Sequence, residues 1–176
     1  MLEIKKLTVD DGDNIYDMLQ EIPAEENGFG NSVNGMSIEQ FKGWLEKSAK
    51  SSEQKEIIDG WKVPQTTYWL YEDGIPVGMG KIRHFLTDAL KTAGGHIGYA
   101  IRPSARGRGL GKAQLKLLIS EARKIGIGDI LITVREDNTA SLKVALANGG
   151  VLEKTENERH YIWINRTDDK NDSSTV

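Results

Sequence analysis

Apolar residues recur along the chain at two spacings, and each spacing predicts a different kind of element. Alternation of apolar and polar positions is typical of strands, and it predicts strands over residues 2–9, 66–72, 75–85 and 94–102. A spacing of three to four residues is typical of amphipathic helices, and it predicts helices over residues 12–22, 37–46, 110–125 and 138–148. The nearly continuous apolar run at 130–134 predicts a strand that is buried on both faces.

Glycine, proline and polar clusters mark where these elements end. Pro103 cannot donate to a strand ladder and keeps its predecessor extended, so it ends the strand over 94–102. Asp73-Gly74 predicts a hairpin turn. Asp10 or Asp11 is expected to cap the first helix, and Ser37 the second. Residues 24–35 are predicted to form a loop, and residues 47–55 a mobile connection. Residues 86–92 are predicted to form a short connection, with or without a helical turn.

The predicted order of elements is β-α-α-β-β-β-α-β-α-β-β, with a hairpin of strands 151–155 and 159–165 at its end. Strand 94–102, the following helix and strand 129–134 form a β-α-β unit, which implies a parallel pair with a right-handed crossover. The length of 176 residues favours one domain, over residues 1–165. Residues 166–176 are polar, and we expect a disordered tail.

Charge and composition exclude several classes of function. The net charge is −3 and no basic block occurs, which argues against a nucleic-acid partner. The chain has no Cys, so it has no disulfide, thiolate zinc site or cysteine nucleophile. No apolar run approaches the length of about 18 residues that a membrane helix needs, and the first residues lack a signal-like apolar region. We therefore expect a cytoplasmic protein without a membrane partner or a metal.

A glycine-rich turn, Arg106-Gly-Arg-Gly-Leu-Gly111, joins the strand that ends at Pro103 to the helix over 110–125. Such a turn leaves unpaired backbone N–H groups at the positive end of a helix dipole, which favours a phosphate ligand. The glycine spacing differs from the dinucleotide and P-loop fingerprints. Its form, Arg-x-x-Gly-x-Gly, resembles the signature of the GNAT superfamily of N-acetyltransferases, whereas a turn that uses glycine only for packing is the alternative.

The resemblance covers residues 1–165 and is strongest over 94–150. It implies an α/β fold of the GNAT type, in which a central mixed sheet of six to seven strands is flanked by about four helices. It also implies that acetyl-CoA lies between the two parallel strands, with the backbone amide near Ile101 on the thioester carbonyl. The pyrophosphate would be held by Arg106, Gly107, Arg108, Gly109, Leu110, Gly111 and Lys112.

A second segment, Asn138-x-x-Ser141, resembles the motif with which the family contacts the pantetheine arm. Simple helix capping by Asn138 is the alternative interpretation. The chain departs from the family where many members carry a Tyr seven residues after this Asn, as acid for the departing thiolate. Ala145 stands there, and Gly150 stands where Phe often follows Gly. Tyr99 and Ser141 are the candidates that could replace the missing acid.

The sequence offers several candidates for the general base. Strand alternation places His96, Gly98 and Ala100 on one face, and histidine titrates in a useful range. A hydrogen-bonded structural His96 is the alternative. His84, at the end of the neighbouring strand, is a second candidate, and we expect His160 to lie on the surface. Two acceptor-side carboxylates also remain possible, Glu25 and Glu26, and an amine of low pKa would need no base.

The resemblance implies an enzyme, an acetyl-CoA-dependent N-acetyltransferase that acts on a primary amine by direct transfer. The missing Tyr keeps open a non-catalytic acyl-CoA-binding sensor or interaction module, and another phosphate-ligand enzyme is a third possibility. The acceptor, a small molecule or peptide, is not identified by the sequence. Three aromatic residues are candidates for the acceptor side, with a place in the core as the alternative for each, namely Phe29, Trp44 and Trp61. Both a monomer and a homodimer paired through the terminal hairpin are compatible with the pattern.

Overall fold

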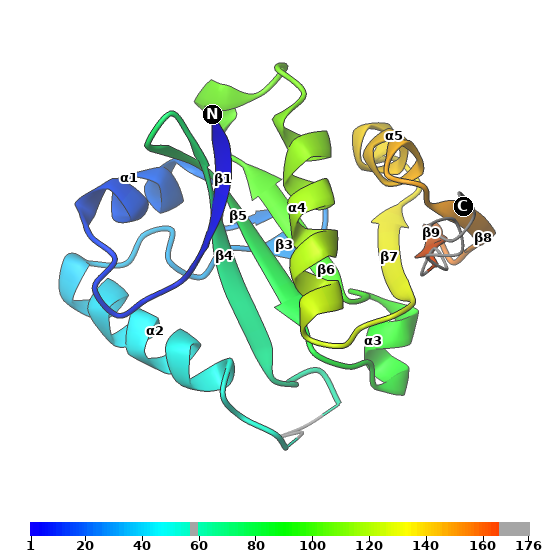
Figure 1. Cartoon of the computed structure of the whole chain (residues 1–176), viewed down its shortest axis with the longest axis horizontal. Coiled ribbons are helices and arrows are strands. Elements are labelled where there is room, and N and C mark those ends of the chain that lie inside the picture. The colour runs from blue at the N-terminus through cyan, green and yellow to red at the C-terminus, as the bar shows by residue number, and fades with distance from the viewer. Residues whose placement is uncertain (57–59, 166–176) are drawn as a thin grey trace, which may run out of the picture.

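The computed structural model describes residues 1–56 and 60–165, so the predicted tail at 166–176 lies outside the described residues. Two sheets meet near the centre of the molecule (Figure 1). The first has the order β1-β4-β5-β6 and is antiparallel throughout. Its strands are β1 (Leu2–Lys6), β4 (Gln65–Glu72), β5 (Ile75–Arg83) and β6 (Ile97–Ile101).

The second sheet has the order β7-β9-β8 and is also antiparallel. Its strands are β7 (Ile130–Arg135), β8 (Val151–Glu156) and β9 (Arg159–Ile164). A small separate hairpin is formed by β2 (Glu25–Glu26) and β3 (Phe29–Gly30). The helices are α1 (Asp13–Glu21), α2 (Ile38–Ser51), α3 (Asp88–Thr92), α4 (Leu110–Lys124) and α5 (Thr139–Ala147).

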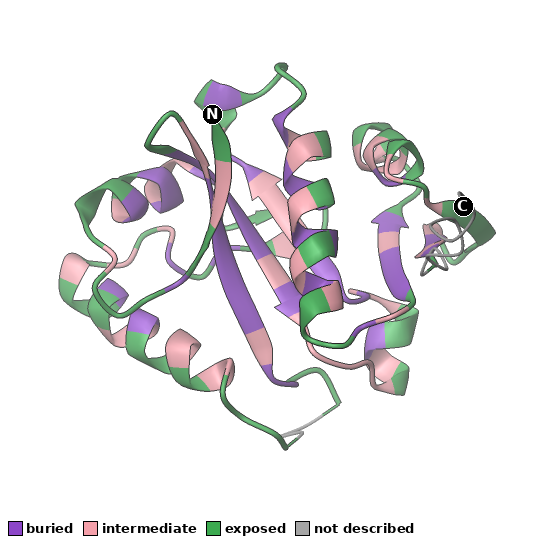
Figure 2. Ribbon diagram, viewed as in Figure 1, coloured by how far each residue is buried: buried purple, intermediate pink, exposed green. Residues whose placement is uncertain are grey.

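Helices cover both sides of the first sheet, as the predicted mixed architecture requires. One core cluster packs α1 and α2 against Trp69 of β4 and Met79 of β5. A second packs the apolar stripe of α4, which includes Leu115 and Leu118, between the two sheets. In Figure 1, α4 crosses in front of the strands and α1 and α2 lie to the left. Buried positions follow β4, β5 and β7 and the inner stripes of the helices (Figure 2).

The predicted fold class is confirmed, and most predicted elements are present. The β-α-β unit is also present, because β6 and β7 run in the same direction on either side of α4 (Figure 1). These two strands, however, belong to different sheets instead of forming a continuous parallel ladder. The seven strands of the two larger sheets therefore split four and three at this junction.

Several local predictions were wrong. The second helix continues to Ser51, so residues 47–51 are helical and not part of a connection, because nothing in this polar stretch breaks a helix and a capping box at Ser37 anchors its start. The first helix is capped by Gly12 instead of Asp10 or Asp11. The Asp11 carboxylate accepts bonds from the Thr8 N–H and from the Trp69 indole instead.

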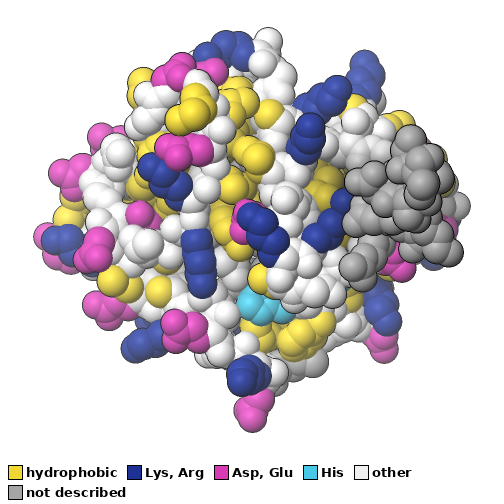
Figure 3. Space-filling model, in the orientation of Figure 1, with side chains coloured by type: hydrophobic (Ala, Val, Ile, Leu, Met, Phe, Trp, Pro, Cys, Tyr) yellow, Lys and Arg dark blue, Asp and Glu magenta, His cyan; other side chains and the backbone are white. Residues whose placement is uncertain are grey.

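Two features that the sequence does not predict were also not found in the described part of the chain. No helix among these residues is long and apolar enough to span a bilayer. No group of three or more His, Cys, Asp or Glu side chains in the described ranges is placed to hold a metal ion. The face shown in Figure 3 carries Lys and Arg side chains interspersed with Asp and Glu side chains.

Candidate functional site

β6 and β7 are joined at their beginning and part as they proceed. The His96 N–H donates to the Leu131 carbonyl at 2.8 Å, and the Leu131 N–H donates back to His96 Nδ1 at 3.0 Å. The Gly94 N–H adds a third link, to Thr133 Oγ1 at 2.9 Å. Beyond His96, residues of β6 pair with β5 alone. The two strands therefore diverge from a closed end into an open gap.

Strand pairing leaves backbone groups of β6 directed into this gap. Arg83 donates to the His96 carbonyl and Arg102 donates to the Val77 carbonyl. In an antiparallel pair, hydrogen-bonded residues alternate with residues that turn their backbone groups the other way. Tyr99 and Ile101, which lie between the bonded positions, therefore present their N–H groups toward β7. The Ile101 N–H, which the resemblance assigns to a thioester carbonyl, is therefore one of the backbone groups that face the gap.

The gap opens into a cleft of about 510 Å³. Its walls come from β5, β6, β7 and β9, from the β2–β3 hairpin, and from the first turns of α4 and α5. Most of the predicted cofactor residues line it, namely Ile101, Arg106, Gly107, Gly109, Leu110, Gly111, Lys112, Asn138 and Ser141. Nine of the ten residues predicted to contact the cofactor therefore lie around one cleft.

The glycine loop meets the requirements of a phosphate site. Gly107 and Gly109 have positive φ angles of 79° and 75°, a region that glycine enters without strain. Gly109 is the N-cap of α4, and no side chain accepts from the first-turn N–H groups. A Cβ atom on Gly111 would lie 3.8 Å from both Tyr99 and Val144, so a larger side chain would narrow the cleft there. The described residues thus fit a diphosphate bound by backbone amides.

The two arginines of the loop do not point at this phosphate site. Arg106 donates from Nε to the Ile101 carbonyl at 2.9 Å, and its two terminal nitrogens hold the Glu26 carboxylate at 3.1 and 2.6 Å. Arg108 does not line the cleft, because its guanidinium forms an ion pair with Glu72 at 2.7 Å. The predicted contribution of Arg108 is therefore limited to its backbone, and Arg106 ties the loop to the β2–β3 hairpin.

The start of α5 faces Tyr99 across the cleft. The Asn138 side chain caps α5, accepting from the Ser141 N–H at 3.2 Å, and Asn138 also lines the cleft, so capping does not remove it from the predicted cofactor wall. The Tyr99 hydroxyl donates to Ser141 Oγ at 3.4 Å. Burial raises the pKa of Tyr99, and its bond with Ser141 offsets part of that effect. Ala145 is fully buried in the core, whereas Tyr99 lines the cleft from β6.

Neither predicted histidine base lines the cleft. His96 is buried, and its ring accepts from the Leu131 N–H at the closed end of the strand pair. Burial, together with the charge of Arg83, lowers the pKa of His96 to about 4, so this ring is neutral at physiological pH. His84 lies against Thr66 Oγ1 at 2.8 Å, outside the cleft. These contacts favour the structural alternative for His96, because its ring completes the ladder where β6 and β7 separate.

The candidate residues on the acceptor side differ in whether they line the cleft. Glu26 lines the cleft but is paired with Arg106, and Glu25 accepts from the Gly28 N–H without reaching the cleft. Phe29 lines the cleft from the hairpin. Trp44 packs on neighbouring rings of the α1–α2 core, and Trp61 is 59% exposed and lies outside the cleft.

Sequence reasoning missed two cleft residues on β5, Lys81 and Arg83. They occupy alternate positions of an otherwise apolar strand, directly after Gly78 and Gly80. A Cβ atom on Gly80 would lie 2.7 Å from Leu118, so these glycines admit α4 on the opposite side. Two cations on one face of a central strand were the signal that could have found them, because such a strand rarely carries unpaired charge.

Comparisons with known proteins match this geometry. A family model described as acetyltransferase (GNAT) family matches residues 35–149. Comparison with curated proteins gave no significant match. Among solved structures, a ribosomal-protein-S5-alanine acetyltransferase from Vibrio fischeri has a TM-score of 0.68 at 15% identity, covering 95% of this chain and 94% of that one.

Two further solved structures contain acetyl-CoA. The putative acetyltransferase yncA from Salmonella typhimurium has a TM-score of 0.60 at 14% identity, with 95% of each chain covered. The N-acetyltransferase PseH from Campylobacter jejuni has a TM-score of 0.57 at 13% identity, covering 95% of this chain and 100% of that one. At these identities, the likeness shows a shared fold.

Proposed function

The chain belongs to the acetyltransferase (GNAT) family, and we propose that it transfers an acetyl group from acetyl-CoA to a primary amine. The observation that carries this proposal is the uncapped start of α4 beside two diverging strands, with the Gly107–Gly109 turn between them. Backbone amides of this turn would hold the pyrophosphate, and Asn138 would contact the pantetheine arm. The Ile101 N–H would polarise the thioester carbonyl, which supplies the reactive acyl group.

Tyr99 is proposed as the proton donor of the reaction. The acceptor nitrogen forms a bond to the acetyl carbon, the carbon–sulfur bond breaks, and the sulfur that leaves takes up the proton of the Tyr99 hydroxyl. The nitrogen releases one proton as the amide forms, and this proton returns to the Tyr99 oxygen through solvent. A phenol with a raised pKa stays protonated and can supply that proton. Ser141, which holds the Tyr99 hydroxyl, would orient it. This arrangement would replace the acid that many family members place at the position of Ala145.

No predicted base is proposed for deprotonating the amine. His96 and His84 lie outside the cleft, and the Glu26 carboxylate is held by Arg106. We therefore propose that the acceptor binds as the neutral amine, having lost its proton to solvent. In this case the rate should follow the pKa of the acceptor amine and not that of a protein group.

Titration calorimetry with acetyl-CoA, followed by assay of free CoA release with a broad panel of primary amines, tests the proposal. Micromolar binding together with amine-dependent CoA release supports it. Binding without release on any amine would favour the alternative, a non-catalytic acyl-CoA-binding module, for which the absence of a phenol on α5 is the supporting observation. No binding of acetyl-CoA would contradict both.

Three sequence predictions accompany this proposal without further support. They are a cytoplasmic location, a single domain over residues 1–165, and a monomer or homodimer without a nucleic-acid partner. Size-exclusion chromatography with light scattering would decide the oligomeric state.

A further inference from the structure

β5 carries two cations that the proposed cofactor site does not use. Lys81 and Arg83 flank the buried Ile82, so both leave the same face of the strand and line the cleft. Lys81 pairs with Gly98 and Arg83 donates to the His96 carbonyl, which places both at the start of β6. The glycine loop follows the end of β6. Gly98 and His96 precede the last residue of β6, Ile101, by three and five residues, so the two cations lie about 10 to 16 Å from that end along the strand.

Lys81 and Arg83 contact only neutral groups in the described part of the chain. Lys81 Nζ donates to the Gly30 carbonyl at 2.5 Å and lies 4.8 Å from the centre of the Phe29 ring. Arg83 donates to the carbonyls of Gly94 and Gly95, at 3.2 and 3.1 Å. Neither has a carboxylate partner among these residues.

This lack of an opposite charge has a measurable consequence. Burial lowers the pKa of Lys81 to about 8, and the neighbouring positive charge of Arg83 contributes to this shift. Cations that are withdrawn from water without an anion cost folding free energy, and a ligand that supplies the anion recovers it. Lys81 and Arg83 are therefore arranged for an anion that the protein itself does not provide.

The rest of the cleft strengthens this charge pattern. Glu26 is the one carboxylate among the described lining residues, and Arg106 already holds it. Arg159, the first residue of β9, adds a further positive charge to the lining. An anionic molecule would therefore be attracted into the cleft, and a cationic molecule would be repelled.

We infer that the acceptor is an amine that also carries an anionic group, a carboxylate or a phosphate, which Lys81 and Arg83 bind. This inference rests on the proposed acetyl transfer and names its substrate class. The amino group would point along β6 toward the gap near Tyr99, where the carbon–nitrogen bond forms and the carbon–sulfur bond breaks. The anionic group takes no part in bond making, so its contribution is to binding and orientation.

Matched pairs of amines test the inference. Each anionic amine is assayed beside its neutral counterpart, an amino acid beside its primary amide, and phosphoethanolamine beside ethanolamine, with rates corrected for the fraction of neutral amine. CoA release by the protein saturated with acetyl-CoA gives kcat/KM for each. We expect the better anionic member to exceed its counterpart about tenfold or more, since hydrogen bonds to charged groups contribute at least that factor. The two pairs distinguish carboxylate from phosphate.

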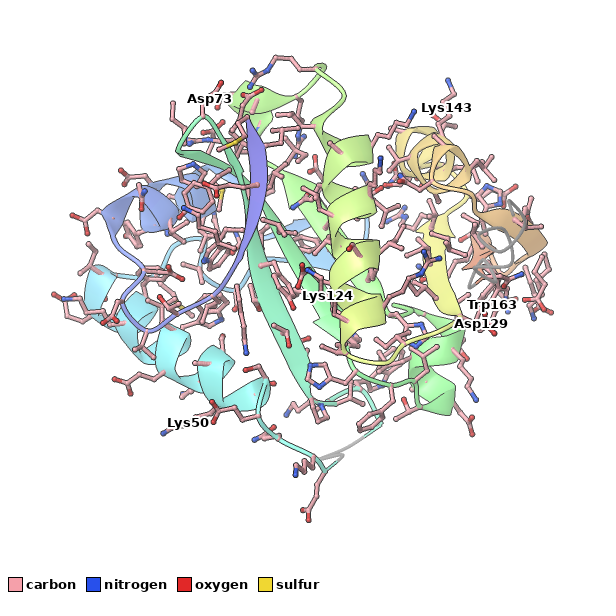
Figure 4. All side chains as sticks on the ribbon, viewed as in Figure 1. Lys50, Asp73, Lys124, Asp129, Lys143 and Trp163 are labelled. Carbon is pink, nitrogen blue, oxygen red and sulfur yellow. The ribbon has the colours of Figure 1, made fainter. Side chains whose placement is uncertain are left out.

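Variants at Lys81 connect this preference to the residue. Lys81→Gln should raise KM for the anionic member and remove most of the preference, whereas Lys81→Arg should retain it. Lys50→Gln removes an equal charge from an exposed lysine near the end of α2, far from the cleft (Figure 4), and should leave the preference unchanged.

Two results would overturn the inference while leaving acetyl transfer intact. One is equal kcat/KM for the members of every pair. The other is a Lys81→Gln variant that lowers kcat for anionic and neutral members alike, which would indicate a base instead of an anion-binding group. If acetyl-CoA binds but no amine of either kind releases CoA, the proposed function fails, and the inference that rests on it falls as well.

Discussion

The two ends of the cleft are built in opposite ways. At the end of β6, the candidate phosphate site consists of backbone N–H groups from one continuous segment, the turn that starts α4. At the start of β6, the candidate anion site consists of side chains, Lys81 and Arg83, held by carbonyls of other segments. The first site depends on glycine conformation, and the second depends on how the β2–β3 hairpin packs on β5.

This difference determines which substitutions each end tolerates. A backbone site keeps its donors when side chains change, and it fails when a side chain enters the space of the ligand or strains a positive φ angle. A side-chain site fails when one charge is removed, although the fold persists. Arg106 connects the two ends, because it belongs to the loop and holds Glu26 of the hairpin.

The largest effect is expected from filling the backbone site. Gly111→Val places branched methyl groups between Tyr99 and Val144, which lie 3.8 Å from the added Cβ. Branched methyl groups forced into the space of the ligand cost about 1–3 kcal/mol, so acetyl-CoA affinity should fall by up to about 100-fold. Titration calorimetry measures the affinity for acetyl-CoA. Gly43→Val is the matched control, because a Cβ on Gly43 of α2 meets no atom within 4 Å. Unchanged affinity in a folded Gly111→Val protein would refute the phosphate assignment.

The second effect concerns the centre of the cleft, where the two ends meet. Tyr99→Phe keeps the ring and removes the hydroxyl that donates to Ser141. Loss of a general acid lowers kcat by about 100-fold, whereas acetyl-CoA affinity should stay within about twofold since no predicted ligand contact is lost. Tyr161→Phe is the control, since that hydroxyl donates to the Thr92 carbonyl outside the cleft. An unaltered kcat in Tyr99→Phe would remove the acid role.

The backbone end could be predicted from the sequence because its determinants are local. Pro103 ends a strand, Gly109 permits a left-handed N-cap, and the apolar stripe of α4 follows within a few residues. The same locality let the order of the larger elements be predicted. The length of α2 was missed because polar residues do not by themselves end a helix, and no Gly or Pro occurs over residues 47–51.

The side-chain end could not be predicted, because it depends on contacts between distant segments. The prediction placed His96 on a face with Gly98 and Ala100, and these two do line the cleft. The backbone turns at Gly95, where φ is 61°, and directs His96 to Leu131 instead. Likewise, Lys81 gains its surroundings only when Gly30 and Phe29, about 50 residues earlier, fold onto β5.

A smaller effect should come from separating the two ends. Glu26→Gln breaks the ion pair with Arg106, which is partly exposed, so stability should change by less than about 1 kcal/mol. The hairpin that positions Phe29 and Gly30 would be less firmly held, and we expect KM for the acceptor to rise about threefold to fivefold. Acetyl-CoA affinity should not change. If affinity for acetyl-CoA falls while the acceptor KM does not, Arg106 serves the cofactor end and the two ends are not linked as described.

The smallest effect is one of stability, and its sign distinguishes a functional charge from a structural one. The pKa of Lys81 is about 8 in the folded protein against an ordinary value of 10.5. Between these values the unfolded chain binds a proton that the folded chain lacks, so stability rises with pH in this window, and the cost of the charged form is complete below pH 8. Lys81→Met should therefore be more stable than the wild type at pH 7, by about 1 kcal/mol after loss of the Gly30 bond and the Phe29 contact.

That advantage should disappear above the ordinary lysine pKa, where both states are neutral. Urea unfolding of both proteins at pH 7 and at high pH measures the difference. Arg83 is the charged neighbour that acts on the pKa of Lys81, and it is common to both proteins, so its own contribution cancels to first order. If the charge of Lys81 lowers the stability of the folded protein, a ligand that it binds would explain the presence of that charge. A Lys81→Met variant that is less stable than the wild type at pH 7 would mean that Lys81 holds the hairpin, and its charge would need no ligand to explain it.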